Sequence, residues 1–188
     1  MAFLFDETKI PGVFVIQPQV FEDSRGYFME TYKKEPFVEH GINVEFVQDN
    51  ESFSTKGVLR GFHFQKNHAQ GKLVRVTYGE VFDVAVDVRP GSKTFGQWVG
   101  VVLSAEIKNM VWVPAGFAHG FLVLSDKAEF VYKCTDVYDP SSEGGIPWND
   151  PDIAVDWPKL DCAYKINERD RKHPSFREQN FFWAEKWL

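Results

Sequence analysis

Alternation of apolar and polar residues is the feature that most limits how this chain can fold. Residues 81–88 (VFDVAVDV) place four apolar side chains on one face of an extended segment and Asp83, Ala85 and Asp87 on the other. A period of two residues indicates a half-buried β-strand. Similar β-rich runs recur along the chain, at Val13–Gln17, Val44–Val47, Leu73–Tyr78, Trp98–Leu103, Met110–Val113, Gly120–Leu124 and Glu129–Thr135.

Turn sequences rich in Gly, Pro, Asp and Ser separate these runs, at residues 23–26, 89–92, 114–116 and 139–142. Many short strands with frequent turns predict an all-β fold, an antiparallel sandwich or jelly-roll barrel. Helical periodicity is weak except around Glu35–His40 and in the last dozen residues, so we expect only a few short peripheral helices. We find no repeat or linker and expect a single domain over residues 1–188.

Composition narrows the function classes. Of 188 residues, 44% are hydrophobic and 26% are charged, as in ordinary globular proteins, and the net charge is -6. A chain that neutralises phosphates along a nucleic acid polymer normally carries a basic excess, so we expect no such partner. No run approaches the ~20 apolar residues of a membrane helix. The N-terminus does not read as a signal peptide, and two cysteines without CxxC spacing suit a reduced, cytoplasmic protein.

The chain ends in an aromatic tail that begins at about residue 176 and is densest over residues 180–188 (NFFWAEKWL). Apolar surface of this size normally has a partner. We expect the tail to dock against its own barrel, with a subunit interface as the alternative.

Five histidines are the first candidates for chemistry. A barrel metal site needs two imidazoles two residues apart on one strand, whereas residues 61–65 (GFHFQ) offer only His63, with Gln65 where a second ligand would lie. We therefore expect no metal. His63 suits a general base near neutral pH, although this segment taken alone favours a hydrogen-bonded core histidine. His40, His68 and His173 lie in polar contexts and are expected at the surface.

Three further side chains are of interest. His119 follows a Pro-Ala-Gly turn and precedes a glycine, so small residues leave room beside its ring. Tyr132 shares a strand face with apolar neighbours, and its hydroxyl needs a partner if it is buried. Lys72 has the same parity as Val74 and Val76, an apolar face on which lysine is rare without a function. A solvated lysine at a strand end is the competing interpretation.

At these residues the chain closely resembles the dTDP-4-dehydrorhamnose 3,5-epimerase family. The resemblance runs in order from about Pro11 to about Asp170. It is carried by residues 46–52 (FVQDNES), 58–65 (VLRGFHFQ), 70–76 (QGKLVRV), 82–87 (FDVAVD), 95–98 (FGQW), 114–121 (PAGFAHGF) and 138–148 (YDPSSEGGIPW).

The resemblance implies a cupin-like jelly roll that forms a homodimer and uses no metal or organic cofactor. It implies inversion of C3 and C5 of the nucleotide sugar dTDP-4-dehydro-6-deoxy-D-glucose, giving dTDP-4-dehydro-L-rhamnose for dTDP-L-rhamnose and polysaccharide biosynthesis. Both carbons flank the C4 ketone, so proton abstraction through an enolate suffices.

Site residues also follow from the resemblance. It implies that His63 is the general base with Asp170 as its carboxylate partner, that Tyr132 is the acid on the opposite face, and that Lys72 lies beside the C4 oxygen. Phe28 and Tyr138 are implied as stacking partners for sugar or base. The substrate-contact positions are Arg25, Phe28, Glu30, Gln48, Asn50, Arg60, His119, Tyr138, Glu143 and Arg169.

Two residues depart from the family pattern: Arg169 stands where the family commonly has Lys, and Phe62 replaces the usual Leu. The nearest competing function is a 3- or 5-monoepimerase of a related dTDP-4-keto-deoxysugar. Catalytically silent sugar binding and metal-dependent oxygenation are two further functions that a jelly roll could carry.

Overall fold

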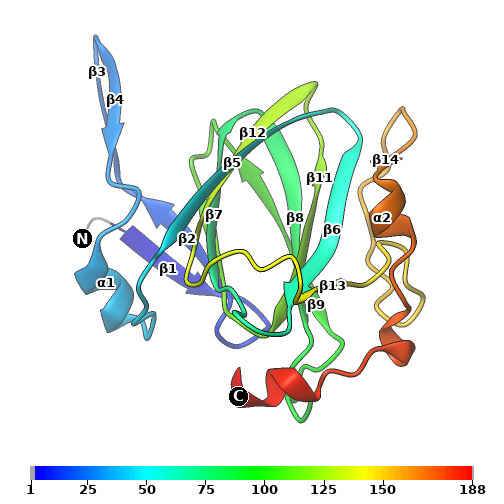
Figure 1. Ribbon diagram of the computed structural model, residues 1–188. Helices are drawn as coiled ribbons and strands as arrows, with labels where there is room; N and C mark the ends of the chain where they lie inside the picture. The colour runs from blue at the N-terminus through cyan, green and yellow to red at the C-terminus, as the bar shows by residue number, and fades with distance from the viewer. Residues whose placement is uncertain (1–2, 188) are drawn as a thin grey trace.

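The computed structural model describes residues 3–187, so Leu188 of the aromatic tail lies outside the described residues. The chain forms two facing sheets that close into a barrel (Figure 1). The first sheet runs in the order β1 (Phe3–Glu7), β2 (Phe14–Pro18), β10 (Met110–Val113), β7 (Lys72–Tyr78), β12 (Lys127–Cys134) and β5 (Gln48–Thr55). The second runs β13 (Glu143–Gly145), β6 (Val58–Gln65), β11 (Phe117–Val123), β8 (Glu80–Asp87) and β9 (Trp98–Ser104).

Pairing within both sheets is antiparallel, except that β14 (Lys165–Ile166) runs parallel to β6. The helices are short, as predicted: α1 (Lys34–Glu39), α2 (Glu168–Arg171) and the 3-10 helices η1 (Phe176–Glu178) and η2 (Phe182–Trp187). The all-β jelly-roll prediction is confirmed. None of the helices in residues 3–187 is long and apolar enough to cross a membrane.

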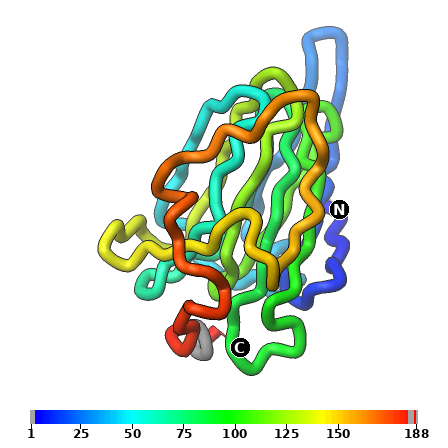
Figure 2. The backbone as a smooth tube through the Cα atoms, turned by 90° about the vertical axis from the view of Figure 1, so that its right-hand side faces the viewer, coloured from blue at the N-terminus to red at the C-terminus, as the bar shows by residue number. Residues whose placement is uncertain are grey.

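The alternation in β8 separates two cores. Val81 and Ala85 face the barrel interior, where they pack with residues of the first sheet such as Val74 and Phe130. Val84 and Val86 face outward and are nevertheless fully buried. The segment from Ile146 to Trp183 covers that outer face, as the yellow-to-red part of the tube in Figure 2 shows. The polar side of β8 therefore faces the barrel interior instead of solvent.

The aromatic tail docks on its own barrel, as expected. The Trp183 ring stacks on Phe64 of β6 with centroids 5.0 Å apart and an interplanar angle of 20°. Phe181 is buried and packs edge-on against Phe64. The tail thus becomes part of the second core.

One predicted strand is wrong. Residues 44–47 form no strand, although Val47 donates a backbone hydrogen bond to the Cys134 carbonyl. Val44 and Phe46 pack against a third core, a cluster of buried residues that includes Phe37 and Trp112. There the Phe46 ring meets Tyr32 and Trp112 edge-on. The strand begins only at Gln48, where pairing with β12 starts.

A hairpin projects from the barrel near the N-terminus. Strands β3 (Val20–Asp23) and β4 (Gly26–Met29) pair only with each other and extend away from both sheets (Figure 1). Phe21, Tyr27 and Phe28 on this hairpin are each more than half exposed. An apolar arm of this kind has the composition of a contact surface.

Candidate active site

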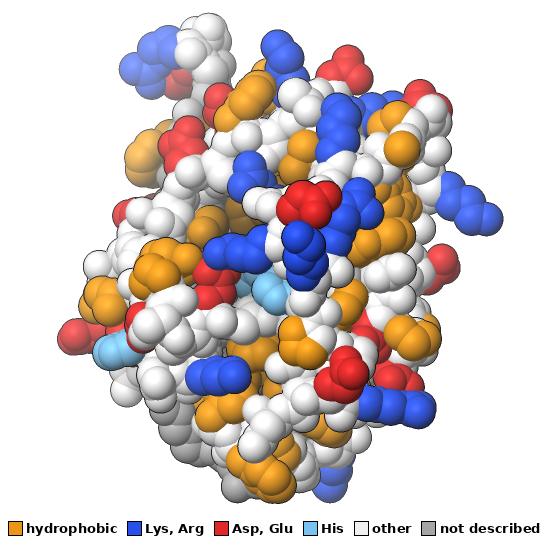
Figure 3. Space-filling view, turned by 45° about the vertical axis from the view of Figure 1, so that its right-hand side comes forward, with side chains coloured by type: hydrophobic (Ala, Val, Ile, Leu, Met, Phe, Trp, Pro, Cys, Tyr) orange, Lys and Arg blue, Asp and Glu red, His pale blue; other side chains and the backbone are white. Residues whose placement is uncertain are grey.

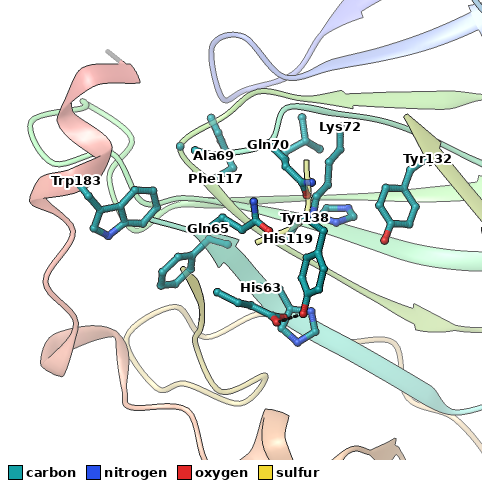
Figure 4. A pocket seen from close by; sticks show the side chains of 14 residues that line it. His63, Gln65, Ala69, Gln70, Lys72, Phe117, His119, Tyr132, Tyr138 and Trp183 are labelled. Carbon is teal, nitrogen blue, oxygen red and sulfur yellow. Dashed lines mark hydrogen bonds between the residues drawn. The ribbon is translucent and has the colours of Figure 1, made fainter. Parts of the chain in front are cut away.

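A cavity opens between the two sheets, and side chains from both of them line it (Figure 4). The cavity volume is about 100 Å³. Its lining includes His63, Gln65, Gln70, Lys72, Phe117, His119, Tyr132, Tyr138, Glu143 and Trp183. Figure 3 shows the face toward α2, with basic side chains gathered around a hollow in which a histidine is visible.

Two glycines allow His63 to enter this cavity. Gly61 has a φ of +116°, and a Cβ there would lie 2.6 Å from the Cα of Gly120. A Cβ on Gly120 would in turn lie 2.7 Å from the Arg60 carbonyl oxygen. Strands β6 and β11 can therefore approach only because both positions are glycine. The close pairing sets His63 directly opposite His119.

His63 and Asp170 form a hydrogen-bonded pair. The His63 Nε2 atom lies 2.9 Å from Asp170 Oδ1, and the Gly61 amide donates to Asp170 Oδ2 at 3.2 Å. The Asp170 side chain is only 4% exposed. Burial alone would raise the pKa of Asp170, but the hydrogen bond and charge of His63 and the Gly61 amide together hold it below its ordinary value. Asp170 is therefore an ionised partner for the imidazole.

Parallel pairing of β14 with β6 brings Asp170 to this position. Lys165 and Ile166 align with Val58 and Leu59, so the chain reaches α2 beside His63. The Asn167 side chain then accepts a hydrogen bond from the Arg169 amide at 3.0 Å and caps α2. This cap orients the single turn that carries Asp170.

Tyr132 and Lys72 enter the cavity from the opposite sheet, on β12 and β7 (Figure 4). Burial raises the pKa of Tyr132 to about 12, so its phenol stays protonated at neutral pH. The Lys72 ammonium lies 5.7 Å from the centroid of the Tyr132 ring. Burial lowers the pKa of Lys72. The expected inward parity of Lys72 is confirmed.

His119 lies beside His63 and is held by a carboxylate that the sequence pattern did not single out. Its Nε2 atom lies 2.9 Å and 3.0 Å from the two oxygens of Asp83, which is 2% exposed. Asp83 sits on the inward parity of β8. The alternation in residues 81–88 is the one sequence feature that could have pointed to Asp83. It does not decide the matter, because a strand face with two aspartates is equally typical of a solvent-exposed face.

A second polar cluster lies at the cavity mouth. The Tyr138 hydroxyl donates to Glu143 Oε2 at 2.7 Å, drawn as a dashed line in Figure 4. Arg169 donates to both Glu143 oxygens, at 2.8 Å and 3.0 Å. The planar guanidinium makes these paired contacts through two separate nitrogens, a geometry that a single ammonium nitrogen does not share. These three predicted contact residues are thus brought together by the fold.

Gln48 and Asn50 lie on β5 beside this cluster and outside the residues that line the cavity. Gln48 accepts a hydrogen bond from the Tyr138 amide at 2.8 Å and donates to Asn50 at 3.0 Å. Asn50 lies opposite Tyr132 in the β5–β12 pairing. Arg60 donates to Ser54 at 3.1 Å and 3.2 Å. Its positive charge opposes the larger effect of burial, which raises the pKa of Tyr132.

Three predicted contact residues are not brought to the cavity within this single chain. Arg25 lies in the hairpin turn and pairs with Asp23. Phe28 is on β4 and 67% exposed, and Glu30 directly follows that strand. The hairpin points away from the barrel (Figure 1).

The surface placement expected for His173 is wrong. Its side chain is only 13% exposed, because it packs on Gly145 and lies 3.9 Å from Asp170 Oδ1. Burial, followed by the charge of His63, lowers the pKa of His173. Among the described residues, His63, Asp170 and His173 are the group whose donor atoms could hold a metal ion, all lying within 4.8 Å of one another. The argument from residues 61–65 against a metal does not include His173, which lies far along the chain.

Comparison with known proteins gives a consistent result. The family model described as dTDP-4-dehydrorhamnose 3,5-epimerase matches residues 7–178. A Pseudomonas aeruginosa protein of that name is 56% identical over 174 residues, covering 92% of this chain and 96% of the relative. A Methanothermobacter thermautotrophicus protein of the same name is 53% identical over 177 residues, covering 94% and 96%.

A solved structure is similarly close. It is that of dTDP-6-deoxy-D-glucose-3,5-epimerase RmlC from Legionella pneumophila Philadelphia 1 in complex with dTDP-4-keto-L-rhamnose. It superposes with a TM-score of 0.93 at 48% identity, covering 96% of each chain.

Proposed function

The chain belongs to the dTDP-4-dehydrorhamnose 3,5-epimerase family, and we propose that its barrel cavity inverts C3 and C5 of dTDP-4-dehydro-6-deoxy-D-glucose. The product is dTDP-4-dehydro-L-rhamnose, which is the class of ligand bound in the Legionella relative. The protein is thus an isomerase of dTDP-L-rhamnose biosynthesis.

One observation carries this proposal: a histidine–carboxylate pair and a protonated tyrosine face the same cavity from opposite sheets. Inversion at carbon requires a base on one side of the sugar ring and an acid on the other, since a single residue would return the proton to the side it left. His63 on β6 and Tyr132 on β12 meet that requirement. A sugar-binding protein without catalysis has no need of such a pair.

The proton transfers follow from the hydrogen bonds. With Asp170 on Nε2, the Nδ1 atom of His63 is free to take the proton from the carbon next to the C4 ketone. The ionised Asp170 stabilises the imidazolium that results. Tyr132 then delivers a proton to the opposite face of the enolate, and solvent restores both groups between turnovers.

Lys72 supplies the electrostatic contribution. The C–H electrons move onto the C4 oxygen as the enolate forms, and an enclosed ammonium beside that oxygen stabilises the developing charge. Its carbon stem runs along the same inward face as Val74. A preorganised donor of this type commonly contributes about 10²–10³ in rate.

Substrate contacts involve a second copy of the chain in this proposal. Arg60 and Arg169 can bind the diphosphate from the barrel itself. Arg25, Phe28 and Glu30 lie on or beside the exposed hairpin, so in a homodimer they would reach the cavity of the partner. Exposed rings at residues 21, 27 and 28 support a contact role for this arm.

The compartment proposed is the cytoplasm. Cys134 and Cys162 are both unpaired, and Cys162 is exposed, which suits a reducing environment.

Product analysis tests the proposed function. The enzyme is incubated with dTDP-4-dehydro-6-deoxy-D-glucose, and the configuration at C3 and C5 is followed by proton NMR. Inversion at both centres is the expected result. Inversion at a single centre would identify a monoepimerase, and an unchanged sugar would leave only the binding role.

A further inference from the structure

His173 gives the catalytic pair a third potential metal ligand. Its Nε2 atom lies 3.9 Å from Asp170 Oδ1, which itself lies 2.9 Å from His63 Nε2. The two imidazole rings meet edge-on, with centroids 5.9 Å apart at 78°. The two nitrogens and the carboxylate oxygen all lie within 4.8 Å of one another.

The residues around His173 fix the position of its ring but leave its Nε2 atom without a hydrogen bond among the described residues. The Nε2 atom is buried and makes no hydrogen bond within residues 3–187. A Cβ on Gly145 would lie 2.3 Å from this atom, so the ring fits only because that residue is glycine. A buried ring nitrogen without a hydrogen bond, facing an ionised carboxylate, is poised to accept a ligand.

We propose that His63, Asp170 and His173 form an inhibitory site for a divalent cation of the zinc class. Two imidazole nitrogens and one carboxylate oxygen are a donor set that zinc prefers, with the fourth position left to water. Donor atoms around tetrahedral zinc with bonds of about 2.0–2.1 Å are separated by roughly 3.3 Å. The 2.9 Å and 3.9 Å separations bracket that value. The His63 and His173 donor atoms lie up to 4.8 Å apart, so side-chain rotation must bring them closer when the cation binds.

Inhibition follows from the tautomer of His63. A neutral imidazole that binds metal through Nε2 carries its ring proton on Nδ1. That is the atom which must be unprotonated to act as base, and the cation also takes Asp170 away from its hydrogen bond. The metal binds both groups without any oxidation or bond cleavage, so removing it restores the enzyme. Only this inhibitory consequence rests on the proposed function.

Zinc binding is tested directly on the purified full-length protein by calorimetric titration with zinc chloride. Metal-free wild-type protein should bind one zinc ion per chain, and His173→Gln should weaken that site at least about tenfold. The matched control is His68→Gln, because His68 and Asp136 form an exposed histidine–carboxylate pair with a 3.1 Å separation and no third ligand within the described residues. His68→Gln should bind zinc like the wild type.

Activity provides the second measurement. Zinc should inhibit the wild type and the His68→Gln variant, a chelator should reverse this, and His173→Gln should retain turnover but resist zinc. Absence of zinc binding, or equal affinity in wild type and His173→Gln, would overturn the site. Binding that leaves turnover untouched would overturn the inhibition. The two proposals can also fail separately. If the metal-free protein shows no epimerase activity but binds zinc through His173, the proposed function is refuted and the zinc site stands.

Discussion

At the scale of single residues, the buried ammonium of Lys72 lowers the stability of the folded protein while serving the proposed reaction. Burial lowers the pKa of its ammonium below the ordinary value of 10.5. The unfolded chain therefore holds this proton more tightly than the folded protein does. The charged lysine consequently disfavours folding at every pH below its folded-state pKa. This penalty fades as the pH rises from the folded-state pKa to 10.5, and it is gone above 10.5.

Replacing Lys72 with methionine should therefore raise thermal stability and lower activity. The stem still fills the same space, while the buried charge is gone. We expect a higher melting temperature at neutral pH, a gain that shrinks toward alkaline pH, and a loss of roughly 10²–10³ in kcat.

Lys133→Met is the matched control, because Lys133 lies one position from Tyr132 but pairs with Asp49 at the surface. It should alter neither quantity appreciably. A Lys72→Met variant that is less stable than wild type at neutral pH would contradict the account of the buried charge.

Single residues could be placed from the sequence where the alternation of inward and outward positions along a strand was clear. The inward placement of Lys72 follows from counting in twos along β7, and the cavity position of Tyr132 is consistent with its apolar neighbours on β12. Asp83 and His173 were missed for a common reason. Each polar side chain is buried by a contact distant in sequence, with His119 and Gly145 respectively, and local pattern carries no record of such contacts.

At the scale of elements, the short α2 turn is what presents Asp170 to His63. It has four residues, and such a helix has little intrinsic stability. Its two supports are the parallel β14–β6 pairing and the Asn167 cap.

Removing the Asn167 cap should affect activity more than global stability. Asn167→Ala should cost about 1 kcal/mol locally and lower kcat with little change in KM, because Asp170 would no longer be held against the imidazole. Steady-state kinetics and thermal melts measure both effects.

Ser175→Ala is the control, since Ser175 stands at the N-cap of η1, where its hydroxyl donates to Glu178 at 2.7 Å. It should leave kcat unchanged. Equal losses of kcat in the two variants would show that the cap has no specific role.

Element boundaries show where sequence patterns mislead. Val44–Val47 has strand composition but forms no strand, and its link to β12 is the single backbone hydrogen bond from Val47 to Cys134. The polar segment Gln48–Thr55, by contrast, pairs with β12 along its whole length. Strand β14 has two residues, too few to show any period. Such elements are determined by their partners instead of by their own composition.

At the scale of the whole molecule, the projecting hairpin distinguishes a self-contained site from a shared one. Among residues 3–187, Arg25 forms its ion pair with Asp23 and lies outside the cavity lining. In the proposed homodimer it completes the site of the partner.

Mixing two defective variants tests this arrangement. His63→Asn and Arg25→Ala should each be impaired as pure proteins, but mixed dimers contain one site with both an intact base and an intact arm. Unfolding and refolding an equal mixture should therefore restore up to about one quarter of wild-type activity, beyond the sum of the two variants. Activity no greater than that sum would contradict a shared site.

In the proposed mechanism, His63 removes the protons on both sides of the ketone, so the decisive measurement is their exchange with deuterated solvent. We predict that wild-type protein incorporates deuterium at both C3 and C5 of the sugar, detected by NMR. His63→Asn should lower both exchange rates by about 10²–10⁴ while the protein still binds dTDP. Exchange at the wild-type rate in a folded His63→Asn variant would contradict the account.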